Sequence, residues 1–120
     1  MKHIIVAVLI LFNGAACADD MVERFYRGKV ISLYVGTAAG NVFCLRTERV
    51  SRYMRRNIPG EPTIVIRYMP GAGGVVATNY LANLAPQDGT ALLASQYNMA
   101  TLQAVDTLAV KFDASKFYWI

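Results

Sequence analysis

The chain has 120 residues, and its 12 lysines and arginines outnumber its 8 aspartates and glutamates, which gives a formal net charge of +4. It contains one histidine, His3, and two cysteines, Cys17 and Cys44. That inventory excludes a zinc site or a histidine-based catalytic arrangement in the part of the chain beyond its N-terminal segment. We therefore predict no catalytic residues, no metal and no cofactor.

The N-terminal segment has the pattern of a secretory signal peptide. A basic start at Lys2 precedes an unbroken apolar run over residues 4–12, and Ala16-Cys17-Ala18 fits a small-x-small cleavage site. The apolar run is much shorter than the roughly 20 residues that a membrane span needs. We predict a signal peptide over residues 1–18, export to the periplasm, and a mature chain that begins at Asp19 and has no membrane span.

Two alternatives remain for this segment: an uncleaved N-terminal anchor, or a lipoprotein in which Cys17 carries the lipid. If the signal is cleaved, Cys44 is the one cysteine left, so no internal disulfide can form. We expect Cys44 to be a small buried apolar residue, because the chain offers no histidine to activate it as a nucleophile.

Beyond the signal, strand-like and helix-like patterns alternate along the chain. The sequence predicts strands over residues 30–36, 63–68 and 90–95, and helices over residues 42–57, 75–84 and 99–105. The run over residues 63–68 is continuous and β-branched, as in a strand buried on both faces. The alternation predicts an α/β fold in which helices flank a parallel sheet.

The first predicted helix carries a cluster of arginines. They alternate with Val50, Tyr53 and Met54, and their spacing of three and four residues places several on one side: Arg46, Arg49, Arg52, Arg55 and Arg56. A nucleic-acid patch is one interpretation of such a cluster. We favour the solvated outer face of an amphipathic helix, because an exported protein rarely meets nucleic acid, and we predict no nucleic-acid partner.

The run Pro70-Gly71-Ala72-Gly73-Gly74 lies between the second predicted strand and the second predicted helix. Glycines at such a turn let the backbone approach a ligand and present free amide N–H groups to it. The positive end of the following helix dipole favours an anion at the same place. This helix is expected to have an apolar face made of residues with helical spacing: Val75, Val76, Tyr80, Leu81 and Leu84.

The glycines have two other interpretations. One is a turn that merely needs positive φ. The other is the phosphate loop of a nucleotide-dependent enzyme, but Val76 takes the place of the third glycine of the G-x-G-x-x-G pattern. No Lys-Ser or Lys-Thr pair follows either, so a nucleotide-triphosphate loop is disfavoured.

Several motifs, in order, resemble the N-terminal part of the Bug-type periplasmic solute receptors, which are the binding subunits of tripartite tricarboxylate transporters. They extend from Phe25 to Ile120: Phe25-Tyr26-Arg27-Gly28-Lys29, Ile58-Pro59-Gly60-Glu61-Pro62-Thr63, Met69-Pro70-Gly71-Ala72-Gly73-Gly74, Asn79-Tyr80-Leu81, Ala85-Pro86-Gln87-Asp88-Gly89-Thr90 and Phe112-Asp113-Ala114-Ser115-Lys116-Phe117-Tyr118-Trp119-Ile120. Each motif alone is weak, whereas the ordered set is specific.

The resemblance implies a two-lobed receptor of the type II periplasmic-binding-protein fold that closes on a small organic carboxylate and delivers it to membrane subunits. Residues 19–120 would then be the N-terminal portion of lobe 1, an incomplete fold without its second lobe. The implied ligand-binding residues follow the predicted strands: Thr37, Ala38, Gly71, Ala72, Gly73 and Gly74, with Ser95 and Asn98 added for their polar groups. The alternative is an exported remnant with no function.

The chain departs from the family pattern at three places. The first loop has Ala39-Gly40-Asn41 where the family usually has Pro-Gly-Gly, and Cys44 stands where an aspartate normally opens the helix. Tyr68 replaces the asparagine that usually lies two residues before the proline of the glycine loop. The asparagine at position 41 tolerates positive φ, so the turn itself can be kept.

Overall fold

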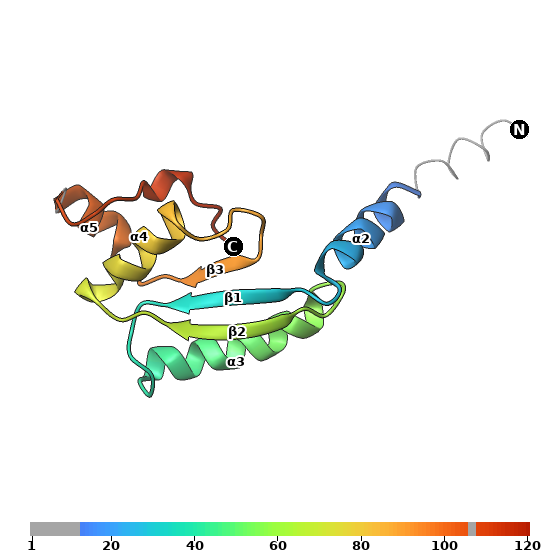
Figure 1. Cartoon of the computed structure of the whole chain (residues 1–120), viewed down its shortest axis with the longest axis horizontal. Helices are drawn as coiled ribbons and strands as arrows, with labels where there is room; N and C mark the ends of the chain where they lie inside the picture. Colours follow the sequence, from blue (N-terminus) through green and yellow to red (C-terminus); the bar gives the residue numbers. More distant parts are fainter. Residues whose placement is uncertain (1–12, 106–107) are drawn as a thin grey trace, which may run out of the picture.

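A computed structural model describes residues 13–105 and 108–120 (Figure 1). Its helices and strands follow in the order α2 (Asn13–Tyr26), β1 (Val30–Val35), α3 (Val42–Asn57), β2 (Thr63–Tyr68), η1 (Ala72–Gly74), α4 (Val75–Asn83), β3 (Ala91–Ala94), α5 (Met99–Val105) and η2 (Ala114–Lys116). Most of the predicted signal peptide, residues 1–12, lies outside the described residues. The helix α2 continues through the predicted cleavage point between Ala18 and Asp19.

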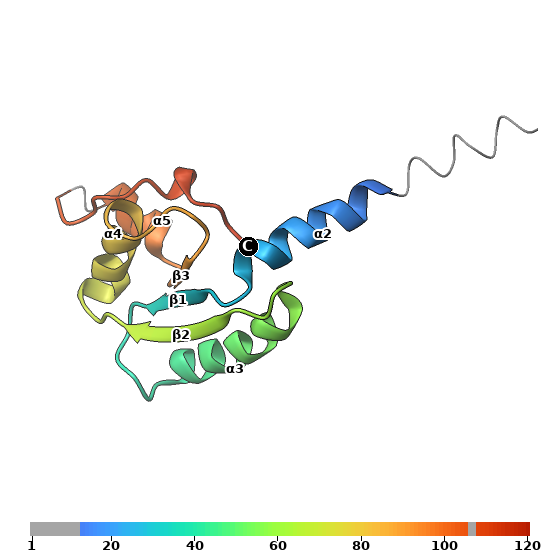
Figure 2. The same cartoon turned by 45° about the vertical axis from the view of Figure 1, so that its right-hand side comes forward.

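The three strands form one parallel sheet in the order β2-β1-β3. The register pairs Val30 with Thr63 on one side of β1, and Ser32 with Ala91 on the other. Helix α3 lies along one face of the sheet, and α4 with α5 lies on the other (Figures 1 and 2). The predicted α/β class, with a small parallel sheet flanked by helices, is confirmed.

The core is centred on β1, which has a neighbour on both edges. Ile31, Leu33, Tyr34 and Val35 of this strand are all buried. A second cluster joins α4 and α5 to the C-terminal segment and consists of Val75, Met99, Val110 and Phe112. The sheet therefore has one well-covered strand, β1.

The expectation that residues 63–68 are buried on both faces is wrong. In β2, Thr63, Val65, Arg67 and Tyr68 are exposed, while Ile64 and Ile66 are half-buried. The strand is an edge strand that pairs only with β1. The β-branched run thus reflects strand propensity, and the alternating exposure is that of an edge strand with one covered face.

The apolar helix faces also differ from those expected. The side of α3 that packs on the sheet is small or polar, since Cys44, Thr47 and Ser51 are its buried residues and Val50 and Tyr53 are exposed. Small side chains let this helix lie close to the sheet, and the larger apolar ones are left on its flanks and outer side.

A similar difference is found in α4. Val75 is buried, as expected, but Val76 and Leu84 are exposed, and Ala77 and Thr78 take the interior positions. The hydroxyl of Thr78 is satisfied inside, because its Oγ1 donates to the carbonyl of Gly74 at 2.9 Å. Which residues of this helix are buried is therefore decided by contact with the glycine loop and not by side-chain size.

Helix α2 extends away from the sheet (Figures 1 and 2). Its C-terminal end is fixed to the body, because Tyr26 Oη donates to the carbonyl of Gly89 at 3.1 Å. Gly28, with φ +73°, turns the chain from this helix into β1. Among the helices that the structure describes, none has both the length and the hydropathy required to cross a bilayer.

Candidate functional site

The predicted ligand-binding residues all lie on the loops that follow the three strands. Because the strands are parallel, these loops gather at one edge of the sheet, the edge of the strands' carboxyl ends. The chain crosses from β2 over β1 to β3, so the direction of the connections switches between β1 and β3. In open α/β sheets this switch point is where ligands bind.

Two glycines bring the first and second loops into backbone contact. A Cβ atom at Gly36 would lie 2.7 Å from the Cα atom of Gly74. A Cβ atom at Gly74 would in turn lie 3.2 Å from Cγ of Gln96 and 3.4 Å from Cε of Met99, on the third loop and the start of α5. The three loops therefore meet around Gly74: the backbone of Gly74 leaves no room for a side chain at Gly36, and a methyl group at Gly74 itself would require Gln96 and Met99 to move slightly.

The glycine loop has a left-handed backbone over three successive residues: φ is +45° at Ala72, +61° at Gly73 and +97° at Gly74. The amide of Gly74 donates to the carbonyl of Gly71 at 2.9 Å, and the amide of Val75 donates to the carbonyl of Ala72. The amides of Ala72 and Gly73 have no acceptor among the described residues, and both residues are exposed.

Helix α4 begins directly behind this loop, and no side chain caps its N-terminus. Its first amides and the two unpaired loop amides thus lie at the same end of the helix, where the helix dipole is positive. An added methyl group at Gly73 would meet nothing within 4 Å, so this side of the loop is open. The loop can accept an anion without any charged side chain.

The first loop is tied to the start of α3. Cys44 is buried, as expected, and its Sγ donates to the carbonyl of Ala38 at 3.1 Å and lies 3.2 Å from Oγ1 of Thr37. Asn41 caps the helix, since its Oδ1 accepts the amide of Cys44 at 2.8 Å. These bonds hold Thr37 and Ala38 in place, and they engage the hydroxyl of Thr37 within the loop itself.

The third loop contributes one unsatisfied group. Ser95 uses its hydroxyl locally, donating to the carbonyl of Gln96 at 3.0 Å. The Oδ1 atom of Asn98 is buried and accepts no hydrogen bond, alone among the buried side-chain nitrogen and oxygen atoms of the described residues. A buried carbonyl oxygen without a donor is costly, which is consistent with ordered water or a hydrogen-bond donor of a ligand completing the site.

Three residues near the site were not singled out from the sequence. Gly36 provides the close approach to Gly74, Gln96 packs against it, and Thr78 links the loop to Met99 by donating to its Sδ atom at 3.3 Å. Gly36 had a detectable signal, because a glycine at the end of a buried strand often marks a close approach of backbone. Gln96 and Thr78 had none.

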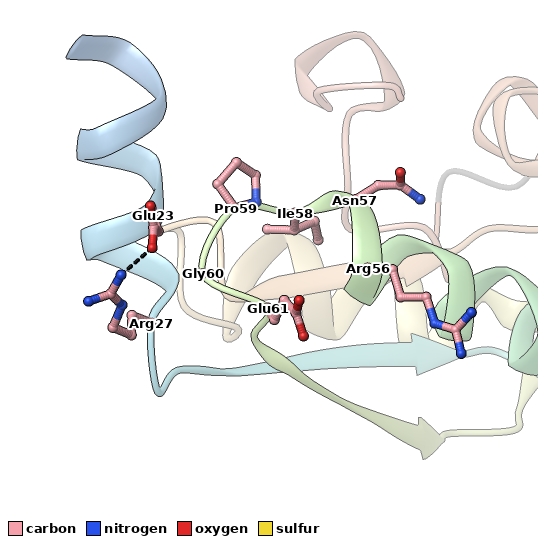
Figure 3. Close-up of a pocket in the computed structure, with 8 residues that line it drawn as sticks. All are labelled: Glu23, Arg27, Arg56, Asn57, Ile58, Pro59, Gly60 and Glu61. Carbon is pink, nitrogen blue, oxygen red and sulfur yellow. Dashed lines mark hydrogen bonds and ion pairs between the residues drawn. The ribbon is translucent and has the colours of Figure 1, made fainter. Parts of the chain in front are cut away.

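Two cavities lie away from the glycine loop. One, of about 620 Å³, opens at the amino ends of the strands, where the loop before β2 approaches α2 (Figure 3). Glu23 and Arg27 form an ion pair on its wall. A Cβ atom at Gly60 would lie 2.6 Å from the carbonyl oxygen of Glu23, so the loop and the helix are in close contact there.

The second cavity, of about 550 Å³, is an apolar groove between α3, the face of β1 and β3, and the segment 116–120. Of the predicted ligand-binding residues, Ser95 is the one that lines it. Its lining includes Leu33, Val50 and Trp119, so it has the character of an uncovered sheet face rather than of an anion site. Among the described residues, no group of three His, Cys, Asp or Glu side chains could hold a metal ion.

Tyr68, at the end of β2, has a shifted pKa. Its hydroxyl donates to Oε1 of Glu48 at 2.7 Å, and this hydrogen bond to a carboxylate raises the pKa of Tyr68 to about 12. The raised pKa means that the bond favours the folded state at neutral pH. That contribution is lost as the pH rises from the ordinary tyrosine value towards 12, where the phenolate forms beside Glu48.

We expect a phenolate absorbance titration of the full chain to contain a step near pH 12 that is missing in Tyr68→Phe. In Glu48→Gln the step should move back towards the ordinary value, because the carboxylate that opposes ionisation is gone. Far-ultraviolet circular dichroism at each pH separates this step from alkaline unfolding. A Glu48→Gln curve identical to that of the native chain, with Tyr68→Phe losing one tyrosine from the main transition rather than from a step near pH 12, would show that the bond does not form.

Comparison of the chain with protein-family models, with functionally characterised proteins and with solved structures gave no match.

Proposed function

We propose that this protein binds a small organic carboxylate at the loops around Gly74. The proposal rests on the backbone amides of Ala72 and Gly73, which have no hydrogen-bond acceptor among the described residues. Both amides lie in front of the uncapped N-terminus of α4. They lie at the carboxyl edge of a parallel sheet, beside the switch point between β1 and β3. The unpaired Oδ1 of Asn98 on the third loop is an acceptor, so it would take ordered water or a donor group of the ligand rather than the carboxylate itself.

The role proposed for this binding is that of a periplasmic solute receptor. Support comes from the ordered motifs shared with the Bug-type receptors and from the sheet order β2-β1-β3, with every implied ligand residue on the carboxyl edge. In this proposal the chain is part of one lobe of a type II periplasmic-binding-protein fold. Its partners are the carboxylate and the membrane subunits of a tripartite tricarboxylate transporter.

Binding by these loops alone is expected to be weak, and no turnover is expected. The site lies open at the edge of a sheet, so a bound anion keeps water on one side. Each contact with a helix terminus is then worth about 0.3–1 kcal/mol, and a few such contacts give dissociation constants of the order of millimolar. Tight binding would require a second surface that excludes water and lowers the local dielectric constant.

The proposal is tested by nuclear magnetic resonance of the isotope-labelled full chain during titration with acetate, succinate and citrate. We expect the amide signals of Ala72 and Gly73 to shift and to saturate at about millimolar concentrations. The signals of Gly28 and Gly60, which also have positive φ but precede β1 and β2 at the opposite ends of the strands, serve as internal controls. Sodium chloride at matched ionic strength and the uncharged succinamide should leave all four signals unchanged.

Three outcomes contradict the proposal. Equal shifts with succinamide would show that the negative charge is not recognised. Carboxylate-dependent shifts confined to other loops would place an anion site elsewhere and remove the glycine loop from it. Complete absence of shifts with all three carboxylates would favour the exported remnant without function.

A further inference from the structure

Helix α3 carries a concentrated positive charge. Its five arginines and one glutamate give a net charge of +4, which equals the formal net charge of the whole chain. All five arginines are exposed, and none forms an ion pair or a hydrogen bond with another described residue. The remaining charges of the protein cancel, so this helix dominates its electrostatic field.

Four of the five arginines share one outer face, and Arg55 lies outside it. Opposite the buried Cys44, Thr47 and Ser51, the helical spacing places seven residues with no acid among them: Val42, Leu45, Arg46, Arg49, Arg52, Tyr53 and Arg56. The one acid of the helix, Glu48, lies to the side and accepts the hydroxyl of Tyr68. In both views of the fold no described element covers this outer face (Figures 1 and 2).

The same face exposes large apolar side chains. Val42 is 65% exposed, Leu45 58% and Tyr53 63%. A basic cluster is attracted to anionic lipid headgroups, and exposed aliphatic and aromatic side chains beside it can enter the interface between the headgroups. A nucleic-acid duplex would use the arginines but offer little to Val42 and Leu45.

We propose that the outer face of α3 binds the surface of an anionic lipid bilayer. Arg49, Arg52 and Arg56 would contact headgroup phosphates, while Leu45 and Tyr53 would enter the interface between them. The helix would lie flat on the membrane, with the sheet above it. This surface lies on the side of the sheet, whereas the glycine loop is at its carboxyl edge, so the inference does not depend on the proposed carboxylate binding.

The test is co-sedimentation of the full chain with vesicles of phosphatidylcholine alone and of phosphatidylcholine with an equal part of phosphatidylglycerol. We expect Arg49→Gln with Arg52→Gln to weaken binding to the anionic vesicles by about tenfold or more. Binding to the neutral vesicles, which measures any contribution of the N-terminal apolar run, should not change. A chain with Arg49→Lys and Arg52→Lys should bind like the native protein, because the charge is kept.

The matched control removes the same charge elsewhere. Arg24 and Lys111 are exposed and lie outside α3, and Arg24→Gln with Lys111→Gln should change the binding by less than about twofold. The apolar part of the face is tested by Tyr53→Ser, which should weaken binding several-fold. Tyr97→Ser is its control, because Tyr97 is 99% exposed and lies on the loop between β3 and α5.

Each remaining outcome overturns the proposal. Equal losses in the α3 and control double variants would indicate attraction by net charge alone. Native binding to anionic vesicles in both the Arg49→Gln with Arg52→Gln chain and the Tyr53→Ser chain would place the membrane contact elsewhere. Release by inorganic phosphate beyond the effect of sodium chloride at equal ionic strength would indicate a phosphate-ion site, and preferential binding of a DNA duplex over anionic vesicles would indicate a nucleic-acid surface.

Discussion

Replacement of Gly36 by alanine is expected to lower the free energy of unfolding by about 2–3 kcal/mol, because the new methyl group overpacks the contact between two loops. It would lie 2.7 Å from the Cα atom of Gly74 and 3.4 Å from its carbonyl oxygen. These are backbone atoms, so no flexible side chain can move away. One of the two loops must shift, and the carboxyl edge of β1 would open.

The sign of the effect distinguishes packing from backbone entropy. Gly36 does not have positive φ, so alanine there would otherwise stabilise the chain by about 0.4–1 kcal/mol through the unfolded state. Gly28→Ala is the comparison for strain without a clash, since Gly28 has φ +73° and open space around it. Urea unfolding followed by circular dichroism measures both variants. A Gly36→Ala chain as stable as the native one would refute the close contact.

Replacement of Gly73 by alanine is expected to weaken carboxylate binding by about tenfold or more, while its cost in stability stays near 1–2 kcal/mol. Gly73 has φ +61°, and its added methyl group would meet no protein atom within 4 Å. The methyl group would therefore occupy the open side of the loop, where the anion must approach the amides of Ala72 and Gly73.

Gly28→Ala is again the matched control, because Gly28 has a similar φ and equally open surroundings at the opposite edge of the sheet. The two variants should lose similar stability in urea, but carboxylate-dependent amide shifts should persist in Gly28→Ala. If the Gly73→Ala chain keeps the native affinity, the glycine loop is not part of the anion site. If both variants lose binding, the effect comes from stability rather than from the site.

The class of the fold could be predicted from the sequence, and so could the strands and α-helices between Val30 and Val105, with bounds within one residue; helix α2 was not predicted. Asn41 and the run from Ile58 to Pro62 bound α3, and the structure places this helix at Val42–Asn57 as expected. The strand at Thr63–Tyr68 has the predicted bounds, and the burial of Cys44 was also predicted. These features depend on caps, helix breakers and apolar periodicity, which act over a few neighbouring residues.

Which surfaces are covered and which groups meet could not be predicted from the sequence, because both depend on the tertiary structure. The position of β2 at an edge, the contact of Gly36 with Gly74 and the unsatisfied amide of Asn98 depend on segments far apart in the chain. The same holds for the outer face of α3, since periodicity shows that a helix has two faces but not which of them packs on the sheet. Strand order sets these contacts, because burial depends on the neighbours that each strand and helix acquires in the folded state.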